Sequence, residues 1–212
     1  MQFNQKESRV FRKLSFCARM AQKIKWHSLK KRGNITSDGD ILILGQCPYI
    51  KTPKDGEIIL EKGVILNSDK AKSNSALTSN VKLTTGYNGV IKIGECSALN
   101  GSCVVAYDSV EIGKYCEIAS CTLISDTDFH PVRPEERLKQ MKGEPFSFDS
   151  VNKAKIKIGD NCWIGYGAII LKGVTIGNNC IVAAGTIVPG GQTFPDNSII
   201  AGNPGRIVKI LE

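Results

Sequence analysis

One histidine stands in a sequence context that suits acid–base chemistry. His130 lies in the string DTDFHP at residues 126–131, and the only other histidine of the chain is His27. An imidazole accepts a proton near neutral pH without an extreme shift of its pKa. Asp126 and Asp128 are near enough in sequence to orient the imidazole, and a main-chain carbonyl would serve equally well. His130 is therefore a candidate for acid–base chemistry.

Eight cysteines raise the alternatives of disulfides and zinc. No two of them form a C-x-x-C pair, and neither histidine is adjacent to one, which argues against a zinc site. Half of them fall on a recurring small-residue position of the repeat described next, where cysteine acts as a small buried hydrophobe: Cys103, Cys116, Cys162 and Cys180. The sequence predicts free thiols and no bound metal.

A period of six residues runs through the carboxyl-terminal part of the chain. Large apolar residues recur at every sixth position without a break: Ile158, Ile164, Ile170, Ile176, Val182, Val188, Phe194 and Ile200. A small or branched residue stands four positions after most of them, and glycine often follows directly. Neither a helix nor a lone strand has this period. It predicts a solenoid of short strands and corners, with three faces closing each coil.

The same pattern occurs upstream with less regularity. Ile93, Leu99 and Val105 form one run with this period. After one inserted residue a second run follows at Ile112, Ile118 and Ile124. Ile59 and Ile65 suggest a weaker, earlier coil. Ser97, Cys103, Cys116 and Thr122 take the small position here. The solenoid is thus expected to extend well before residue 158.

The period stops between Ile124 and Ile156, where a polar segment with three prolines intervenes. A long loop in a strict repeat is usually functional, because the rigid coils position whatever the loop carries. We predict that residues 129–155 form a loop extruded from the solenoid, with His130 at its mouth.

Length and composition limit the class of protein. A chain of 212 residues with 42% hydrophobic and 23% charged residues fits one soluble globular domain with a short appendage. No apolar run approaches the roughly 20 residues of a transmembrane helix, and the polar amino terminus does not resemble a secretory signal. We expect a cytoplasmic protein, with contact at the inner membrane surface as an alternative location.

The net charge of +8 is concentrated at the amino terminus. Residues 1–32 contain ten Lys or Arg and one Glu, a sum of +9, so the remaining residues sum to −1. A near-neutral body argues against a nucleic-acid-binding domain. The spacing of Val10, Leu14, Cys17, Ala21 and Ile24 predicts an amphipathic helix over residues 8–31.

This basic helical segment, residues 1–33, precedes a solenoid domain over residues 34–212. Two roles are open for it: a cap packed on the solenoid with a solvated basic face, which we favour, or a peripheral contact through residues 1–32 with an anionic bilayer or a lipid-linked glycan. His27 lies in this helix and is expected to be structural.

The hexapeptides, of the form [LIV]-[GA]-x-x-[small]-x and ending in IIAGNPGRIVKI, resemble those of the left-handed parallel β-helix acyltransferases. The resemblance covers residues 59–212 loosely and 93–210 well. It implies an all-β fold, a left-handed parallel β-helix solenoid with an amino-terminal α-helix and one long extruded loop. The left hand rests on the resemblance alone, because general chirality favours right-handed crossovers.

The DTDFHP string resembles the maltose, galactoside and polysaccharide O-acetyltransferases. It implies that His130 deprotonates an acceptor hydroxyl, which attacks the thioester of acetyl-CoA directly. Asn100 and Asp108 lie near the spacings of that family's acceptor-binding residues, and Asn100 could equally be a corner residue. The resemblance also implies a coenzyme A groove, built between the subunits of a homotrimer and lined by Trp163, Gly165, Tyr166, Ala183, Ala184, Arg206 and Lys209. Arg206 and Lys209 would pair with the phosphates.

The expected activity is acetylation of a sugar hydroxyl in a cell-surface polysaccharide, its precursor or a related saccharide. One alternative is N-acetylation of a nucleotide-linked amino sugar, which has the same fold and base. The other is a non-catalytic hexapeptide scaffold, including the carbonic-anhydrase-like proteins, whose zinc site needs several histidines.

Overall fold

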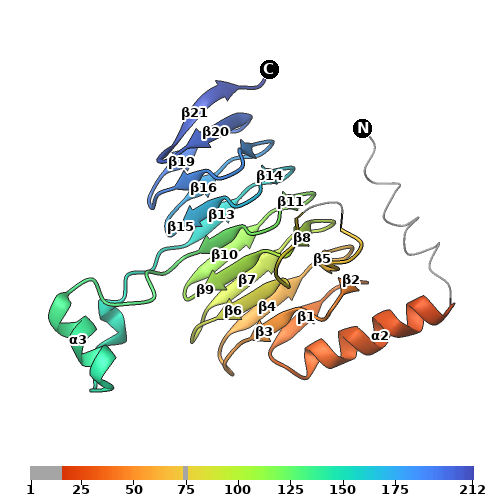
Figure 1. Cartoon of the computed structure of the whole chain (residues 1–212), viewed down its shortest axis with the longest axis horizontal. Helices are drawn as coiled ribbons and strands as arrows, with labels where there is room; N and C mark the ends of the chain where they lie inside the picture. Colours follow the sequence, from red (N-terminus) through yellow and green to blue (C-terminus); the bar gives the residue numbers. More distant parts are fainter. Residues whose placement is uncertain (1–15, 74–75) are drawn as a thin grey trace.

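The computed structural model describes residues 16–73 and 76–212, and most of them form a three-sided solenoid (Figure 1). Its faces are three sheets whose successive strands are parallel. Sheet A contains β1 (Ile35–Ser37), β4 (Glu57–Leu60), β7 (Val90–Ile93), β10 (Ser109–Ile112), β13 (Ile156–Ile158), β16 (Thr175–Ile176) and β19 (Thr193–Phe194).

Sheet B contains β2 (Leu42–Gly45), β5 (Ile65–Ser68), β8 (Ala98–Asn100), β11 (Glu117–Ile118), β14 (Trp163–Ile164), β17 (Ile181–Val182), β20 (Ser198–Gly202) and the antiparallel β21 (Gly205–Ile210). Sheet C contains β3 (Tyr49–Lys51), β6 (Lys82–Thr85), β9 (Cys103–Ala106), β12 (Leu123–Ser125), β15 (Ile169–Leu171) and β18 (Ile187–Val188). The chain visits A, B and C in turn, and the predicted left-handed parallel β-helix is confirmed.

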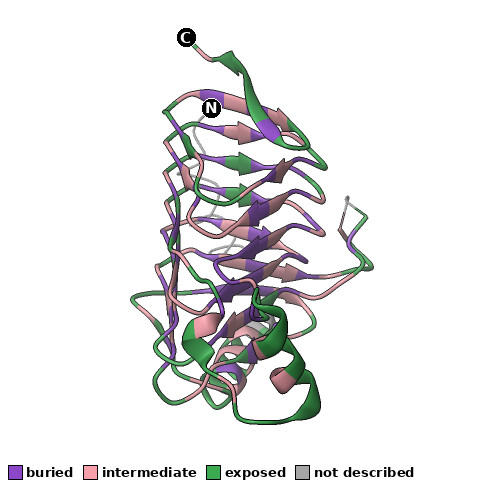
Figure 2. Cartoon of the chain, turned by 90° about the vertical axis from the view of Figure 1, so that its left-hand side faces the viewer, coloured by how far each residue is buried: buried purple, intermediate pink, exposed green. Residues whose placement is uncertain are grey.

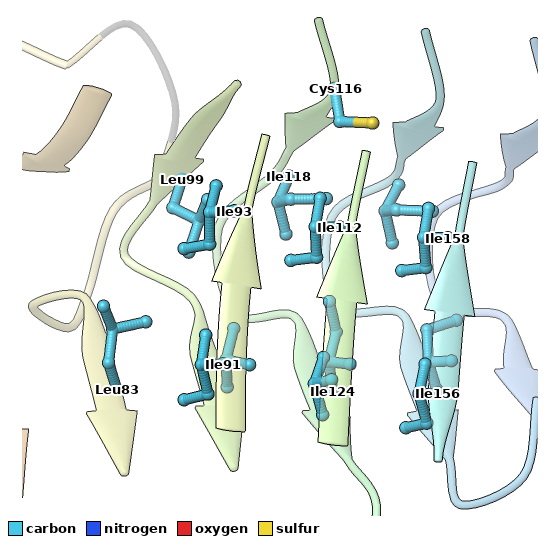
Figure 3. Close-up of a cluster of buried hydrophobic side chains, with 14 of the residues drawn as sticks. Leu83, Ile91, Ile93, Leu99, Ile112, Cys116, Ile118, Ile124, Ile156 and Ile158 are labelled. Atoms are coloured by element: carbon cyan, nitrogen blue, oxygen red, sulfur yellow. The ribbon is translucent and has the colours of Figure 1, made fainter. Parts of the chain in front are cut away.

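Hexapeptides set the size of the last coils. Trp163 pairs with Ile181, and Ile181 pairs with Ile199, so each coil there takes three hexapeptides. All eight residues of the unbroken six-residue series are buried, with at most 5% of their surface exposed. Figure 3 shows the equivalent side chains of earlier coils stacked inside the solenoid. Each buried aliphatic side chain contributes about 1.5–3 kcal/mol, so the repeat itself supplies the core.

Upstream, the expected register is wrong by one residue in two places. In β4 the buried side chains are Ile58 and Leu60 rather than Ile59, and in β5 the buried residue is Leu66 rather than Ile65. Because side chains alternate across a strand, a shift of one residue exchanges the inner and outer faces. The pairing of Ile58 with Ile91 of β7 fixes the inner register there.

A further shift lies in β9, where Val104 pairs with Ile124 and joins the core in place of the predicted Val105. Leu99 and Val104 are therefore five residues apart and Val104 and Ile112 eight, so one residue is missing before Val104 and two are added after it. For the same reason Ser102, which is buried, takes the small position that we expected for Cys103. Cys103 pairs with Leu123 on the outer side of sheet C, and burial raises the pKa of its thiol.

The other three repeat cysteines have a common structural role. Cys116, Cys162 and Cys180 are buried one above another at the entrance to β11, β14 and β17. Their thiols donate to the carbonyls of Gly159, Gly177 and Pro195 in the next coil, at 3.1, 3.1 and 3.2 Å. The thiols therefore join neighbouring coils at one corner, and the structure has them as free cysteines.

The helix α2 (Phe16–Lys30) covers the first coil. It is the described part of the helix predicted over residues 8–31, whose first eight residues lie outside the described ranges. Leu29 is fully buried, and Trp26 packs against the core. The Gln22 side chain donates to the carbonyl of Ile43 at 3.0 Å and accepts from its amide at 2.8 Å. Because β2 is an edge strand, these bonds occupy backbone groups with which another chain could pair. The contacts of α2 are those of a cap on the first coil, which is the role that we favoured.

Two insertions leave the solenoid. The extruded loop contains α3 (Pro134–Lys142) and a short 3-10 turn, η2 (Phe148–Ser150), and an antiparallel bridge between Thr127 and Lys153 closes its base. Figure 1 shows α3 at the side of the coils, and Figure 2 shows from that side that the loop is mostly exposed. None of the residues of α3 is buried. A shorter insertion between β5 and β6, which we did not predict, connects sheet B to sheet C, and its residues Lys72 and Ser73 lie beside sheet B. Among the described residues, no helix has the length and apolar character needed to cross a membrane.

Candidate active site

The predicted base, His130, is exposed at the mouth of the extruded loop. Its Nδ1 lies 2.8 Å from Oε1 of Gln140, which is part of α3. An amide oxygen only accepts hydrogen bonds, so this contact assigns the proton to Nδ1. Nε2 then keeps its lone pair and is the atom that can accept a proton. Sequence analysis did not identify Gln140, because a partner ten residues away on a loop helix has no signature in the repeat.

Asp126, one of the two carboxylates that could orient the imidazole, is engaged elsewhere. It is fully buried, and its two oxygens accept from the amides of Tyr107 and Asp108, both at 2.7 Å. Burial raises the pKa of this carboxyl, although the amide bonds oppose that shift. Asp126 therefore anchors the first residues of the loop to the preceding coil, and the expectation that it orients His130 needs correction.

Asp128 likewise binds other partners. Its carboxylate forms an ion pair with Lys172 and accepts a hydrogen bond from the side-chain Nδ2 of Asn152 at 3.2 Å. These contacts connect the start of the loop to its end and to the next coil. The His130 amide donates to the main-chain carbonyl of Asp128 at 2.7 Å, so Asp128 shapes the backbone here while Gln140 takes the imidazole.

A pocket of about 480 Å3 lies on the outer side of sheet B and brings together several predicted site residues. Asn100, predicted to bind the acceptor, lines it together with Trp163 and Tyr166, predicted to bind the cofactor. The two aromatic side chains are 54% and 44% exposed. Lys72 and Ser73 of the unpredicted insertion complete one wall. Exposed ring faces beside polar side chains are typical of a small-molecule site.

Asn100 is held by a chain of hydrogen bonds across three coils. Its side-chain oxygen accepts from Nδ2 of Asn67 at 2.9 Å, and its own Nδ2 donates to Oε1 of Glu117 at 2.8 Å. The parallel register aligns Asn67 with Asn100. This fixed array of amide and carboxylate groups presents both acceptors and donors to the pocket, as recognition of a hydroxylated ligand requires.

The remaining predicted cofactor residues follow one corner of the prism, between sheets B and C. Small residues directly follow the core residue of four successive sheet B strands. The amides of the first three donate to a carbonyl of the next coil, so the four residues form a row: Ala119, Gly165, Ala183 and Ala201. A Cβ at Gly165 would lie 2.6 Å from the Ala184 amide, so only glycine allows this close approach. Ala201 is aligned with Arg206 of β21. The row of small residues thus runs along this corner and ends beside the guanidinium group of Arg206.

Lys209 continues the neighbouring row. The register of sheet B aligns Trp163 with Ile181, Ile181 with Ile199 and Ile199 with Lys209. All of these side chains lie on the outer side of the sheet, where Lys209 is exposed. The two cations predicted to meet phosphates therefore both lie at the carboxyl-terminal end, two coils beyond Trp163.

His130 and Asp108 occupy a different corner. His130 follows β12 of sheet C and precedes β13 of sheet A. Asp108 lies near the same corner, because the ring of its neighbour Tyr107 is 6.5 Å from that of Phe129. The pocket and the small-residue row lie on sheet B and at its corner with sheet C. The width of sheet C separates the two corners, and a strand of four residues such as β9 spans roughly 13 Å. One chain thus keeps the base apart from the sheet B pocket. A second pocket, also of about 480 Å3, lies at the loop corner itself and is lined by Tyr107, Phe129 and Gln140.

One further group at the sheet B pocket was not predicted. The Cys121 thiol lies 3.3 Å from the Thr78 hydroxyl and 3.4 Å from that of Tyr166. These two hydrogen bonds hold the pKa of Cys121 below its ordinary value. No three His, Cys, Asp or Glu side chains gather as a possible metal site anywhere in residues 16–73 and 76–212.

Comparison with known proteins finds similar hexapeptide-repeat proteins. Residues 155–189 match the model of the hexapeptide repeat of succinyl-transferase. A hexapeptide-repeat-containing acetyltransferase of Vibrio cholerae O1 biovar eltor, solved with acetyl coenzyme A, is 26% identical with a TM-score of 0.51. The alignment covers 61% of this chain and 65% of the Vibrio protein, slightly less than two thirds of that relative's length.

Two further structures share the fold. A maltose O-acetyltransferase from Clostridium difficile 630 is 20% identical over 98% of this chain and 84% of its own, with a TM-score of 0.50. An N-acyltransferase from Bacillus cereus, a point mutant solved with dTDP and coenzyme A, is 21% identical over 88% and 89%, with a TM-score of 0.54. At these identities the likeness concerns the fold alone. A comparison with curated proteins gives no match for this chain.

Proposed function

We propose that this protein transfers the acetyl group of acetyl-CoA to a sugar hydroxyl, with His130 as the general base. The observation that carries the proposal is the pocket on sheet B. It brings the amide array of Asn100 together with Trp163 and Tyr166 at the start of the small-residue row. The amides suit the hydroxyls of a sugar, and the two rings, predicted to bind the cofactor, lie where the small-residue row begins. The acceptor class we propose is a cell-surface polysaccharide, its precursor or a related saccharide.

The small-residue row accounts for the donor. Ala119, Gly165, Ala183 and Ala201 leave room for an extended pantetheine arm against the backbone, and Arg206 and Lys209 supply cations for coenzyme A phosphates at the far end. When the acceptor oxygen attacks the thioester carbon, the C–S bond breaks and the sulfur leaves. His130 takes the hydroxyl proton on Nε2 and can return it to the leaving sulfur, so no covalent acyl-enzyme is needed.

A simple assay tests this function. The protein, acetyl-CoA and one saccharide at a time are incubated, and the free thiol of coenzyme A is measured. Thiol release should depend on the saccharide and should not occur with acetyl-CoA alone. Release that is the same with and without every saccharide in the panel would contradict an acetyltransferase with a sugar acceptor.

The separation of the two corners favours a site shared between copies. A general base must come within hydrogen-bond reach of its substrate proton, and His130 lies a sheet width from the sheet B pocket of its own chain. A cyclic trimer would place the loop corner of one copy against the sheet B pocket of the next. Asp108, beside His130, and Asn100, in the pocket, would then meet at one acceptor although they lie apart in one chain.

Light scattering under dilute native conditions should therefore give three times the mass of the 212-residue chain. A stable monomer with saccharide-dependent acetyl transfer would contradict the shared site. It would leave the activity itself standing.

Gln140 should position the base. Gln140→Leu removes the acceptor for the Nδ1 proton, so we expect turnover to fall at least about tenfold with little change in KM. In Gln140→Glu a carboxylate replaces the amide and favours the protonated imidazole. The acid limb of the rate profile should therefore move to higher pH, by about one unit. A purely structural role for Gln140 would lower the rate without moving the limb.

Nuclear magnetic resonance gives a readout of this contact that does not depend on activity. The chain has only two histidines, so the His27→Ala variant assigns both imidazoles. The nitrogen shifts of His130 should show the proton on Nδ1 in the wild type. A proton on Nε2 would contradict the positioning role of Gln140.

A further inference from the structure

The cap α2 has two faces with different partners, and the inner one is fixed. Leu29 is buried, Gln22 makes two hydrogen bonds to Ile43, and the Lys25 ammonium donates to the carbonyl of Gly45 at 2.7 Å. These contacts determine which way the helix is turned on the first coil. The opposite face is therefore directed away from the solenoid, as the position of α2 across its end shows (Figure 1).

This outer face exposes large apolar side chains. Met20 is 45% and Ile24 is 66% exposed, and they lie four residues apart on one side of the helix. The side chains of Lys23, His27 and Lys30 are exposed around them. An apolar pair surrounded by cations on one helix face is the pattern of a helix that lies at a membrane interface.

The charge of the segment limits what can bind to this face. Residues 16–32 contain six Lys or Arg and no Asp or Glu, whereas residues 33–212 sum to −1. A second copy of α2 would carry the same positive charge and repel this face. A nucleic acid would satisfy the cations and leave the apolar pair in water. An anionic lipid bilayer satisfies both, because its headgroups attract Lys and Arg and its interface accepts apolar side chains.

We infer that the outer face of α2 is a peripheral binding surface for an anionic bilayer. Met20 and Ile24 enter the interface between headgroups and acyl chains, and the surrounding lysines contact the lipid phosphates. This inference does not depend on the proposed acetyl transfer. If both hold, the first coil faces the membrane and the surface of a lipid-linked acceptor lies close to the solenoid.

Vesicle sedimentation with the full chain tests the surface. One set of vesicles is phosphatidylcholine alone, and the other is an equal mixture of phosphatidylcholine and phosphatidylglycerol. The wild type should bind the anionic vesicles and not the neutral ones, and added salt should weaken the binding. Equal affinity for the two kinds of vesicle, or no binding to either at low salt, would overturn the inference.

Three exposed-site variants show which groups act. Lys23→Glu should weaken binding at least about tenfold, since each basic residue near an anionic surface contributes about 1 kcal/mol. Ile24→Ser should weaken it several-fold without changing its salt dependence. Lys157→Glu, with the same charge change on an exposed site of β13, is the matched control and should bind like the wild type.

Each variant result decides the matter. If Lys157→Glu loses as much affinity as Lys23→Glu, net charge and not α2 determines binding, and the inference fails. If Ile24→Ser binds as tightly as the wild type, the face is a general polyanion surface and the bilayer assignment fails. Thermal unfolding of all three variants should match the wild type, because the side chains are exposed.

Discussion

Replacing His130 by alanine should lower the turnover of acetyl transfer by at least about 100-fold. The reason is the loss of Nε2, which the contact between Nδ1 and Gln140 leaves free to take the acceptor proton. Affinity for acetyl-CoA should change little, since the groups proposed to hold it lie on sheet B and its corner with sheet C. Steady-state kinetics and a direct binding measurement check both parts.

The second histidine provides the control. His27→Ala removes an imidazole from the cap and should leave turnover near the wild-type value. A His130→Ala protein that kept most of its turnover as a folded oligomer would exclude this residue as the base and favour the scaffold alternative.

Replacing Asp126 by alanine should give the largest loss of stability among the site residues. The change leaves the buried amides of Tyr107 and Asp108 without the oxygens they now bind at 2.7 Å. Each buried donor without a partner costs about 1–3 kcal/mol, so the free energy of unfolding should fall by roughly 3 kcal/mol. Denaturant unfolding measures this quantity. Turnover should fall as well, because the anchor of the loop that carries His130 is lost.

The pH dependence of this effect has a definite sign. Burial raises the pKa of Asp126 in the folded chain, so the folded state binds this proton more tightly than the unfolded state. The proton-linked part of this group's contribution is fully present below the ordinary aspartate pKa and is lost as pH rises through the raised value. The hydrogen bonds that its oxygens accept from the two amides are a separate contribution. The difference in unfolding free energy between wild type and Asp126→Ala should therefore grow as pH falls.

Asp128→Ala is the matched control for Asp126→Ala. The Asp128 side chain is 28% exposed and its partner Lys172 is 29% exposed, so solvent screens their ion pair. Its loss should cost less than about 1 kcal/mol. If Asp128→Ala destabilised the protein as much as Asp126→Ala, the anchor would not be specific to the buried carboxylate.

The sequence predicted the parts of the fold that repetition encodes. Ile158 to Ile200 lie in the core because a strict six-residue period allows only one register. Where the period is irregular, as around Ile59 and Val105, one residue more or less in a corner changes which side chain points inward. Only the pairing with neighbouring coils settles that choice, and it depends on contacts distant in sequence.

The candidate site divides in the same way. His130 and Trp163 could be chosen from local strings, whereas Gln140 and Lys72 reach the site through insertions that carry no period. Asp126 illustrates the opposite error. Its nearness to His130 in sequence suggested a catalytic partner, and its burial shows that it binds backbone amides of another coil.

Mass spectrometry of the reaction products tests the central claim most directly. The protein is incubated with acetyl-CoA and a panel of neutral, acidic and amino saccharides and nucleotide sugars, and the products are treated with hydroxylamine, which cleaves esters and spares amides. We predict that at least one saccharide gains an acetyl group that hydroxylamine removes, and that His130→Ala fails to form it. An acetyl group found only as a stable amide on an amino sugar would contradict O-acetylation, and no acetylated product from any acceptor would contradict the proposed enzyme.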